Sequence, residues 1–184
     1  MITREQALTL LEQEGQEQNL LHHALQTETV MVALAERLDQ DRKLWGLTGL
    51  LHDLDYARTK DSPEEHGLVS SRILKGLIPE EGLHAIQAHN GERNGVPPES
   101  VLDFALRCGE SVTGLVSANA LVRPQGMEGM KPKSLKKKMK EKAFAASVSR
   151  ENIRECEKLG LELGDFFAIA IDAMSAAGER IGLP

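Results

Sequence analysis

The sequence predicts an all-α fold, and three observations support that prediction. Leu and Ala, which favour helices, dominate a hydrophobic content of 41%, whereas aromatic residues contribute only 3%. Apolar residues recur at three- and four-residue spacing over several long stretches. No run alternates β-branched or aromatic residues with polar ones, as a half-buried strand would. We therefore expect a protein of the all-α class.

The length of 184 residues suits one domain with a buried core. We find no internal repeat, no low-complexity tract and no linker between two domains. We expect a single domain over residues 1–184, with a core at about 18–121 and a C-terminal helical extension at about 131–184.

Capping signals and apolar stripes define the first helices. Thr3 and Gln6 form a capping-box pattern, which predicts a short helix that ends near Gly15. A second helix is predicted over about 20–38. One buried stripe runs along it, formed by Leu20, Ala24, Met31, Leu34 and Leu38.

A third helix is predicted to begin at about Asp41 and to end in the sequence LLHDLDY. Its apolar positions are Leu44, Leu47, Leu50, Leu51 and Leu54. The pattern brings His52 and Asp53 to the end of a buried helix, where unpaired polar groups are costly. A functional reason for these residues is therefore expected.

The sequence SPEEH carries the sharpest helix-start signal. Ser62 suits the N-cap, Pro63 the first helical position, and Glu65 completes a capping box. We predict a fourth helix that begins there, carries His66 in its first turn and ends near Leu77.

Three further segments follow. A fifth helix is predicted from Pro79 to Gly91, the segment GERNGVPP is predicted as a loop, and a sixth helix should span about 99–121 with Glu110 near its middle. Beyond it, KPKSLKKKMKEK concentrates positive charge, which is more often a solvated face than a binding site. Two helical segments split by Gly160 should pack beside the core.

Charge and cysteine content narrow the class of protein. The net charge of −6 argues against broad nucleic-acid binding. The N-terminus is too polar for a signal peptide, and no apolar stretch is long enough to span a membrane. Cys108 and Cys156 form no CxxC pair, and Cys108 is predicted to be a core residue. We expect a cytoplasmic protein with no membrane contact.

The six histidines all lie in the N-terminal half of the chain, at positions 22, 23, 52, 66, 84 and 89. A single buried histidine is usually a satisfied core residue. Several histidines beside a His-Asp pair instead indicate a divalent transition-metal site, because Mn, Fe, Co and Zn accept imidazole and carboxylate together.

Adjacent residues on a helix diverge by about 100° and cannot share a face. His52 and Asp53 can still converge on one ion, because the backbone leaves helical geometry at a helix end. The remaining ligands must come from other helices, and the candidates are His23, His66, His89 and Glu110.

Five segments, in order, resemble the HD superfamily of metal-dependent phosphohydrolases, and most closely its small stand-alone HDIG-type predicted hydrolases. They are LLHHALQTETVMVALAERL, LTGLLHDLDY, PEEHGLVSSRIL, AIQAHNG and ALRCGESVTGL, and they cover about residues 18–120. The resemblance continues through ALVRP, the lysine-rich stretch and IRECEKLGL. It implies an HD-domain helical bundle with one or two divalent ions of Mn, Fe, Co or Zn.

The resemblance implies that His23, His52, Asp53 and Glu110 hold one ion. His23 matches the family's first ligand, and His22 lies beside it. In members with two ions, further histidines match His66 and His89, and Asp53 would bridge the two ions.

The chain departs from the family pattern at two positions. The last ligand is usually Asp, whereas this chain has Glu110, which could instead be a helix acid paired with Arg107. Asp55 occupies the position of the HDIG glycine. It could orient a ligand histidine through a hydrogen bond or cap a loop.

The resemblance implies hydrolysis of a phosphomonoester or phosphodiester, of a nucleotide or a small phosphorylated metabolite, by metal-activated water. Asp53 and Asp55 are the candidate catalytic residues. Arg123 is the preferred substrate-binding residue, with Arg107, Arg93 and the lysines within residues 131–142 as further candidates. We do not expect nucleic acid as a partner, because the lysine run lacks interleaved aromatic residues. The oligomeric state stays open.

Two alternatives remain from the sequence. Some relatives of this fold hold two irons and oxygenate a substrate, and His66 and His89 would serve that chemistry equally well. The chain could also be a non-catalytic nucleotide-binding module with a degraded site, for which Glu110 is the only indication.

Overall fold

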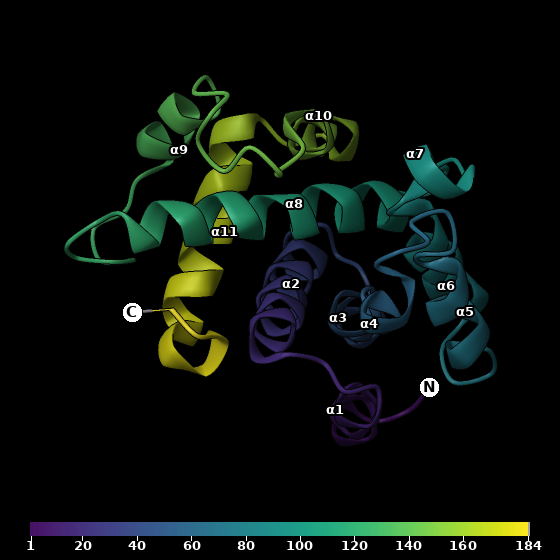
Figure 1. Cartoon of the computed structure of the whole chain (residues 1–184). Coiled ribbons are helices and arrows are strands. Elements are labelled where there is room, and N and C mark those ends of the chain that lie inside the picture. Colours follow the sequence, from purple (N-terminus) through teal and green to yellow (C-terminus); the bar gives the residue numbers. More distant parts are fainter. Residues whose placement is uncertain (184) are drawn as a thin grey trace.

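The computed structural model describes residues 1–183, and it is helical throughout that range, without a β-strand (Figure 1). The α-helices are α1 (Arg4–Gln13), α2 (Gln18–Arg37), α3 (Arg42–Leu51), α4 (Tyr56–Thr59), α5 (Leu68–Leu74), α6 (Glu80–Ala88), α7 (Gly91–Asn94), α8 (Val101–Leu121), α9 (Pro132–Lys138), α10 (Arg150–Arg154) and α11 (Leu163–Ala177). Two short 3₁₀ helices, η1 (Glu155–Leu159) and η2 (Gly178–Ile181), flank α11. The predicted all-α fold class is confirmed.

Helices α2, α3 and α8 pack closely because glycines face the side chains of α2. A Cβ at Gly49 in α3 would lie 2.8 Å from Met31 Cγ and 3.1 Å from the carbonyl oxygen of Thr27. A Cβ at Gly109 in α8 would lie 3.0 Å from Met31 Sδ. The close approach brings the C-terminal end of α3 against α2 and α8, where the histidines lie.

Helix α8 runs across the molecule, with α2 and α3 on one side and α9 and α10 on the other (Figure 1). Its start is set by a capping box in which Ser100 and Asp103 bond to each other's backbone N–H groups. α8 packs against α2, α6, α10 and η1, so it joins the N-terminal helices to the C-terminal ones.

The C-terminal helices share one core with the rest of the chain. Phe166 and Phe167 in α11 and Leu135 in α9 are fully buried in the same hydrophobic cluster as Met31 and Leu50. Cys108 is also buried there, as predicted. Within residues 1–183, every helix is too short or too polar to cross a membrane.

Several predicted helix starts are confirmed. Thr3 caps α1 with a complete capping box, Asp41 caps α3 through the N–H groups of Lys43 and Leu44, and α6 begins after Pro79. These signals are local, and no tertiary contact overrides them.

The predicted helix start at Ser62 is wrong. Residues 63–67 form turns, and α5 begins only at Leu68 because Gly67 has a φ of +82°. A Cβ at Gly67 would lie 2.5 Å from the carbonyl oxygen of Ile86, so this glycine lets the turn pass closely over α6. The predicted loop GERNGVPP also differs from the structure, since its first four residues form α7.

Candidate metal centre

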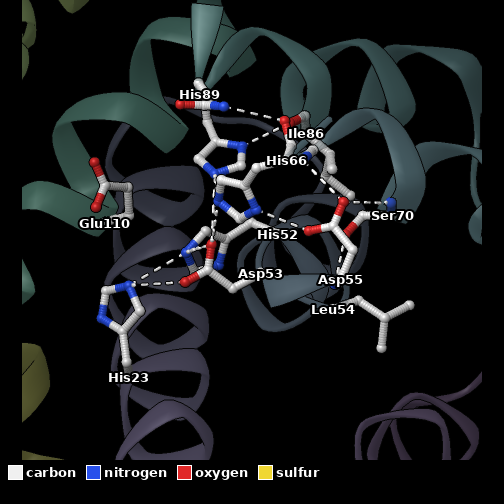
Figure 2. A network of polar contacts seen from close by, with 12 residues as sticks. His23, His52, Asp53, Leu54, Asp55, His66, Ser70, Ile86, His89 and Glu110 are labelled. Carbon is white, nitrogen blue, oxygen red and sulfur yellow. Dashed lines mark hydrogen bonds and ion pairs between the residues drawn. The ribbon is translucent and has the colours of Figure 1, made fainter. Parts of the chain in front are cut away.

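Four histidines and one aspartate converge from four segments (Figure 2). His23 lies in α2, and His52 is the C-cap of α3, with Asp53 next to it. His66 lies in the turn before α5, and His89 is the C-cap of α6. These five residues are among the ligands that were predicted from the sequence, and the fold brings them together.

Asp53 lies at the centre of the cluster. Its Oδ1 is 3.1 Å from His66 Nε2, 3.3 Å from His52 Nε2 and 3.4 Å from His89 Nε2. Its Oδ2 is 3.8 Å from His23 Nε2. One carboxylate therefore faces the Nε2 atoms of all four histidines.

The donor atoms form two groups that could each hold a metal ion. His23, His52 and Asp53 form one group, and Asp53, His66 and His89 form the other, with ligand atoms within 4.8 Å of one another. Asp53 belongs to both. Imidazole nitrogen and carboxylate oxygen suit Mn, Fe, Co or Zn, so the residues present fit such ions.

Backbone carbonyls orient two of the histidines. His52 Nδ1 lies 2.8 Å from the carbonyl oxygen of Gly49, and His89 Nδ1 lies 2.5 Å from that of Ile86. Because a carbonyl only accepts, each Nδ1 carries the proton and donates it. The lone pair on Nε2 is then available to a metal ion.

His23 is oriented by Thr113 in α8. The Thr113 hydroxyl donates to the carbonyl oxygen of Glu110 over 2.6 Å, and it lies 3.2 Å from His23 Nδ1. Having donated its proton, the hydroxyl accepts from Nδ1–H, which leaves the lone pair of His23 on Nε2. Thr113 was not predicted from the sequence, because no local pattern connects it with a residue so far away in the chain as His23.

Asp55 orients His66. Asp55 Oδ1 accepts from His66 Nδ1 over 2.8 Å, while Oδ2 accepts from the N–H groups of Gly67 and Ser70 over 2.9 and 2.8 Å. The hydrogen bond to a ligand histidine is one of the two interpretations that the sequence allowed. Asp55 is fully buried, so its contacts describe a positioning residue, and its predicted catalytic role stays a prediction.

The pKa values of His52 and His66 are shifted in opposite directions. Burial lowers the pKa of His52 to about 3, which keeps its ring neutral. Burial also opposes the charge on His66, but hydrogen bonds to Asp53 and Asp55 outweigh it and raise the pKa of His66 to about 10. Burial would raise the pKa of Asp53 too, yet the surrounding histidines hold it well below its usual value.

Glu110 faces the same cavity but belongs to neither group of ligand atoms. Figure 2 shows it to one side, with no drawn contact to the four histidines. Ser111 donates a hydrogen bond to its carboxylate, and burial raises the pKa of Glu110. The predicted alternative of a Glu110–Arg107 pair is wrong, because Arg107 pairs with Glu92 and Glu155.

Of the three arginines that were candidates for substrate binding, Arg93 lines the cavity, and Arg123 and Arg107 do not. Arg123 donates to the carbonyl oxygens of Gly126 and Glu128 over 2.9 and 2.6 Å, in the turn after α8. Besides its two ion pairs, Arg107 donates to the carbonyl oxygen of Ala88 over 3.0 Å and to that of His89 over 3.4 Å. Arg107 therefore holds the backbone at a ligand histidine, and substrate binding by either arginine is unsupported by these contacts.

The cluster opens into a cavity of about 790 Å³. Among the described residues that line it, Arg93 in α7 is the one arginine or lysine. Tyr56 also lines it, and its ring packs edge-on against His66 at a centroid distance of 5.6 Å. A larger groove of about 930 Å³ lies between α1, α2 and α11, and no histidine lines it.

The two remaining histidines lie outside the cluster. His22 Nε2 is 2.8 Å from Gln18 Nε2 on the same helix. His84 Nδ1 is 3.0 Å from Asp103 Oδ2, beside the capping box of α8. Neither belongs to the two groups of ligand atoms described above.

Comparison with known proteins agrees with this arrangement. The HD domain family model matches residues 20–139, which is more than half of the chain. The chain belongs to the HD domain family. The match begins in α2 and ends just beyond α9, so it includes every residue of the metal centre and stops before α10.

Curated relatives of this HD protein include several proteins named ribonuclease Y. That of Desulfotalea psychrophila is 31% identical over 98 residues, which are 53% of this chain and 18% of the relative. That of Pseudothermotoga lettingae is 29% identical over 144 residues, which are 73% of this chain and 27% of the relative. The chain thus spans about a quarter or less of these relatives, and no solved structure matched it.

Proposed function

We propose that this HD protein is a metal-dependent phosphohydrolase that acts on a phosphomonoester or phosphodiester, such as a nucleotide or a small phosphorylated metabolite. The observation that carries the proposal is the position of Asp53, whose carboxylate faces two pairs of histidines at the base of a cavity. Membership of the HD family supports it.

Two divalent ions would be held in this proposal. His23, His52 and Asp53 would bind one, and Asp53, His66 and His89 the other. Glu110, which faces the same cavity, is retained as a further ligand. Ions of this kind activate water as a nucleophile near neutral pH and offset charge on phosphoryl oxygens.

The chain's own residues would position the ions and the substrate. Asp55, Thr113 and the carbonyl oxygens of Gly49 and Ile86 hold each histidine with Nε2 toward Asp53. Arg93, as the arginine that lines the cavity, is the residue we assign to the substrate phosphate. It takes the place of Arg123 and Arg107, whose guanidinium groups are engaged elsewhere.

The size of the cavity supports a small substrate. Pockets for small molecules are typically about 300–1,000 Å³, and this cavity, at about 790 Å³, lies in that range. The name of the curated relatives, ribonuclease, denotes cleavage of a phosphodiester in RNA. That name supports reaction at phosphorus and makes RNA the main alternative substrate.

The first experiment is metal analysis followed by a substrate screen. Protein purified without chelators should contain about two equivalents of a transition metal per chain. Protein reloaded with Mn, Co, Fe or Zn should hydrolyse at least one ester in a panel of nucleotides, sugar phosphates and dinucleotides. The chelated protein should hydrolyse none. An oxygen electrode on the iron-loaded protein tests the di-iron oxygenase alternative in the same preparation.

A matched pair of variants tests the site itself. His66→Gln and His84→Gln each remove a histidine that contacts an aspartate, but only His66 faces the cavity. We expect His66→Gln to lose metal and hydrolysis and His84→Gln to retain both. Equal behaviour of the two variants would contradict the assigned site. A protein that binds no metal under any loading condition would instead be a binding module.

A further inference from the structure

A segment outside the HD family match forms one side of the cavity. The match ends at residue 139, and we call residues 141–152 the wall segment. Five of its residues line the cavity, namely Ser147, Val148, Ser149, Glu151 and Asn152. The candidate metal ligands therefore face a surface formed by residues outside the range that the family model matches.

One guanidinium group holds the wall segment in shape. Arg150 donates to the carbonyl oxygens of Ala145 and Val148 over 2.6 and 2.8 Å, and it also contacts those of Phe144 and Glu141. Ala145 adopts a φ of +45°, which an L-residue rarely does, so the surrounding contacts determine this turn. Because the Arg150 guanidinium bonds to four backbone carbonyl oxygens of the wall segment, the conformation of this loop is restrained.

The wall segment is also attached to α8, the helix that carries Glu110. A Cβ at Gly114 in α8 would lie 2.9 Å from Val148 Cγ2, so the absence of a side chain at Gly114 allows Val148 to pack against α8. Asn152 Oδ1 accepts from Arg107 Nη2 over 3.0 Å. The same Arg107 supports the backbone of His89, and the wall therefore keeps a defined position relative to the metal ligands.

The charges at the cavity favour a substrate with few phosphates. Besides Asp53, three carboxylates line it, on Glu92, Glu110 and Glu151, and Glu92 and Glu151 are exposed. Arg93 is the one arginine or lysine in the described lining. A chain of phosphates that continued past the metal centre would meet the exposed carboxylate of Glu151 and be repelled, whereas the charge of Glu92 is offset by its ion pair with Arg107.

We infer that the wall segment determines substrate specificity, by restricting the site to a phosphomonoester of about mononucleotide size and excluding RNA chains. The serine and asparagine side chains of the wall offer hydrogen bonds to the hydroxylated part of such a substrate. This inference rests on the proposed function, and it assigns specificity to residues beyond the HD family match.

The test compares one small and one extended ligand. Adenosine monophosphate and a short RNA oligonucleotide are each titrated into the Mn-loaded protein by calorimetry, and turnover of each is followed in parallel. We expect binding of the nucleotide at least about tenfold tighter than that of the RNA, and hydrolysis of the nucleotide alone.

Three variants separate the wall from the metal centre. Arg150→Ala should loosen the wall, and Glu151→Lys should replace repulsion of phosphates by attraction. In both, the ratio of RNA to nucleotide affinity should rise about tenfold while the metal content stays unchanged. Arg154→Ala, an exposed arginine on the same helix, is the control and should leave the ratio unaltered.

The outcomes are distinguishable. Tight RNA binding by the unaltered protein, or an unchanged ratio in folded Arg150→Ala and Glu151→Lys protein, would overturn the inference and leave hydrolysis of phosphate esters standing. Nucleotide binding without turnover of any ester would overturn the proposed function, while the affinity ratio still tests the wall. Failure to bind the nucleotide at all would overturn the wall inference too.

Discussion

The His23–His52 half of the metal centre lies on helices α2 and α3, whereas the His66–His89 half lies on a turn and a helix end. In the first half, buried His52 is neutral because burial lowers its pKa to about 3. In the second, two aspartates raise the pKa of His66 to about 10. The carboxylate of Asp53 therefore contacts two pairs of histidines that are oriented by different kinds of hydrogen-bond partner.

The support in each half has a different origin. Thr113 on α8 orients His23, and backbone carbonyls orient His52 and His89. His66 depends on the buried side chain of Asp55, and on Gly67, which allows the turn. Substitutions in the supports should therefore affect one half at a time, whereas a change at Asp53 should affect both.

The largest expected effect belongs to Asp53→Ala. Removal of the shared ligand should abolish binding of both ions, and hydrolysis should fall by more than the roughly 10- to 100-fold typical of losing a residue that only supports a ligand. Elemental analysis and an ester assay measure the two losses, and circular dichroism should show unchanged helicity. Retention of activity by this variant would disprove the metal-site assignment.

Gly67→Ala should disrupt the second half selectively. Its φ of +82° and the short approach to the carbonyl oxygen of Ile86 both disfavour a side chain, and the left-handed backbone alone costs about 1–2 kcal/mol. We expect a lower free energy of unfolding in urea titrations and a metal content near one equivalent. Gly95→Ala, another left-handed glycine but with nothing within 4 Å of its Cβ, is the matched control for backbone strain. If both variants keep two ions, the turn does not position His66.

Asp55→Asn should weaken the second half while preserving its shape. The amide oxygen can still accept from Gly67 and Ser70, but the NH2 group that replaces the other oxygen cannot accept from His66 as the carboxylate does. We expect the affinity for one ion to fall about 10- to 100-fold and the affinity for the other to change little. Competition titration with a metal indicator resolves the two steps, and equal weakening of both ions would contradict independent supports.

The smallest effect is expected from Thr113→Val, which tests the half of the centre that contains His23. The substitution keeps the size of this fully buried side chain but removes the acceptor for His23 Nδ1. The affinity of the first ion should fall by about tenfold, at the low end for a supporting residue, and that of the second should be unaffected. The same indicator titration measures it, and a loss in the second ion instead would reverse our assignment of Thr113.

The helical class, the starts of several helices, and the four histidines and the aspartate of the candidate metal centre could be predicted from the sequence alone. Capping boxes and apolar periodicity act over a few residues, which is why the starts of α1, α3, α6 and α8 were predictable. The His-Asp pair at a helix end, with its spacing to the other histidines, indicated the site without any structure.

How the histidines are oriented and what surrounds them could be learned only from the tertiary structure. The turn at Gly67 replaces a predicted helix because Asp55 and Ile86, distant in sequence, are packed against it. Arg107 forms ion pairs with Glu92 and Glu155 and not with Glu110, although Glu110 is closer to it in the sequence. The wall segment lies against the cavity because Arg150 holds its loop together and Gly114 leaves space for Val148. A hydrogen bond between residues far apart in the chain depends on how whole helices pack, and this packing cannot be predicted from a short stretch of sequence.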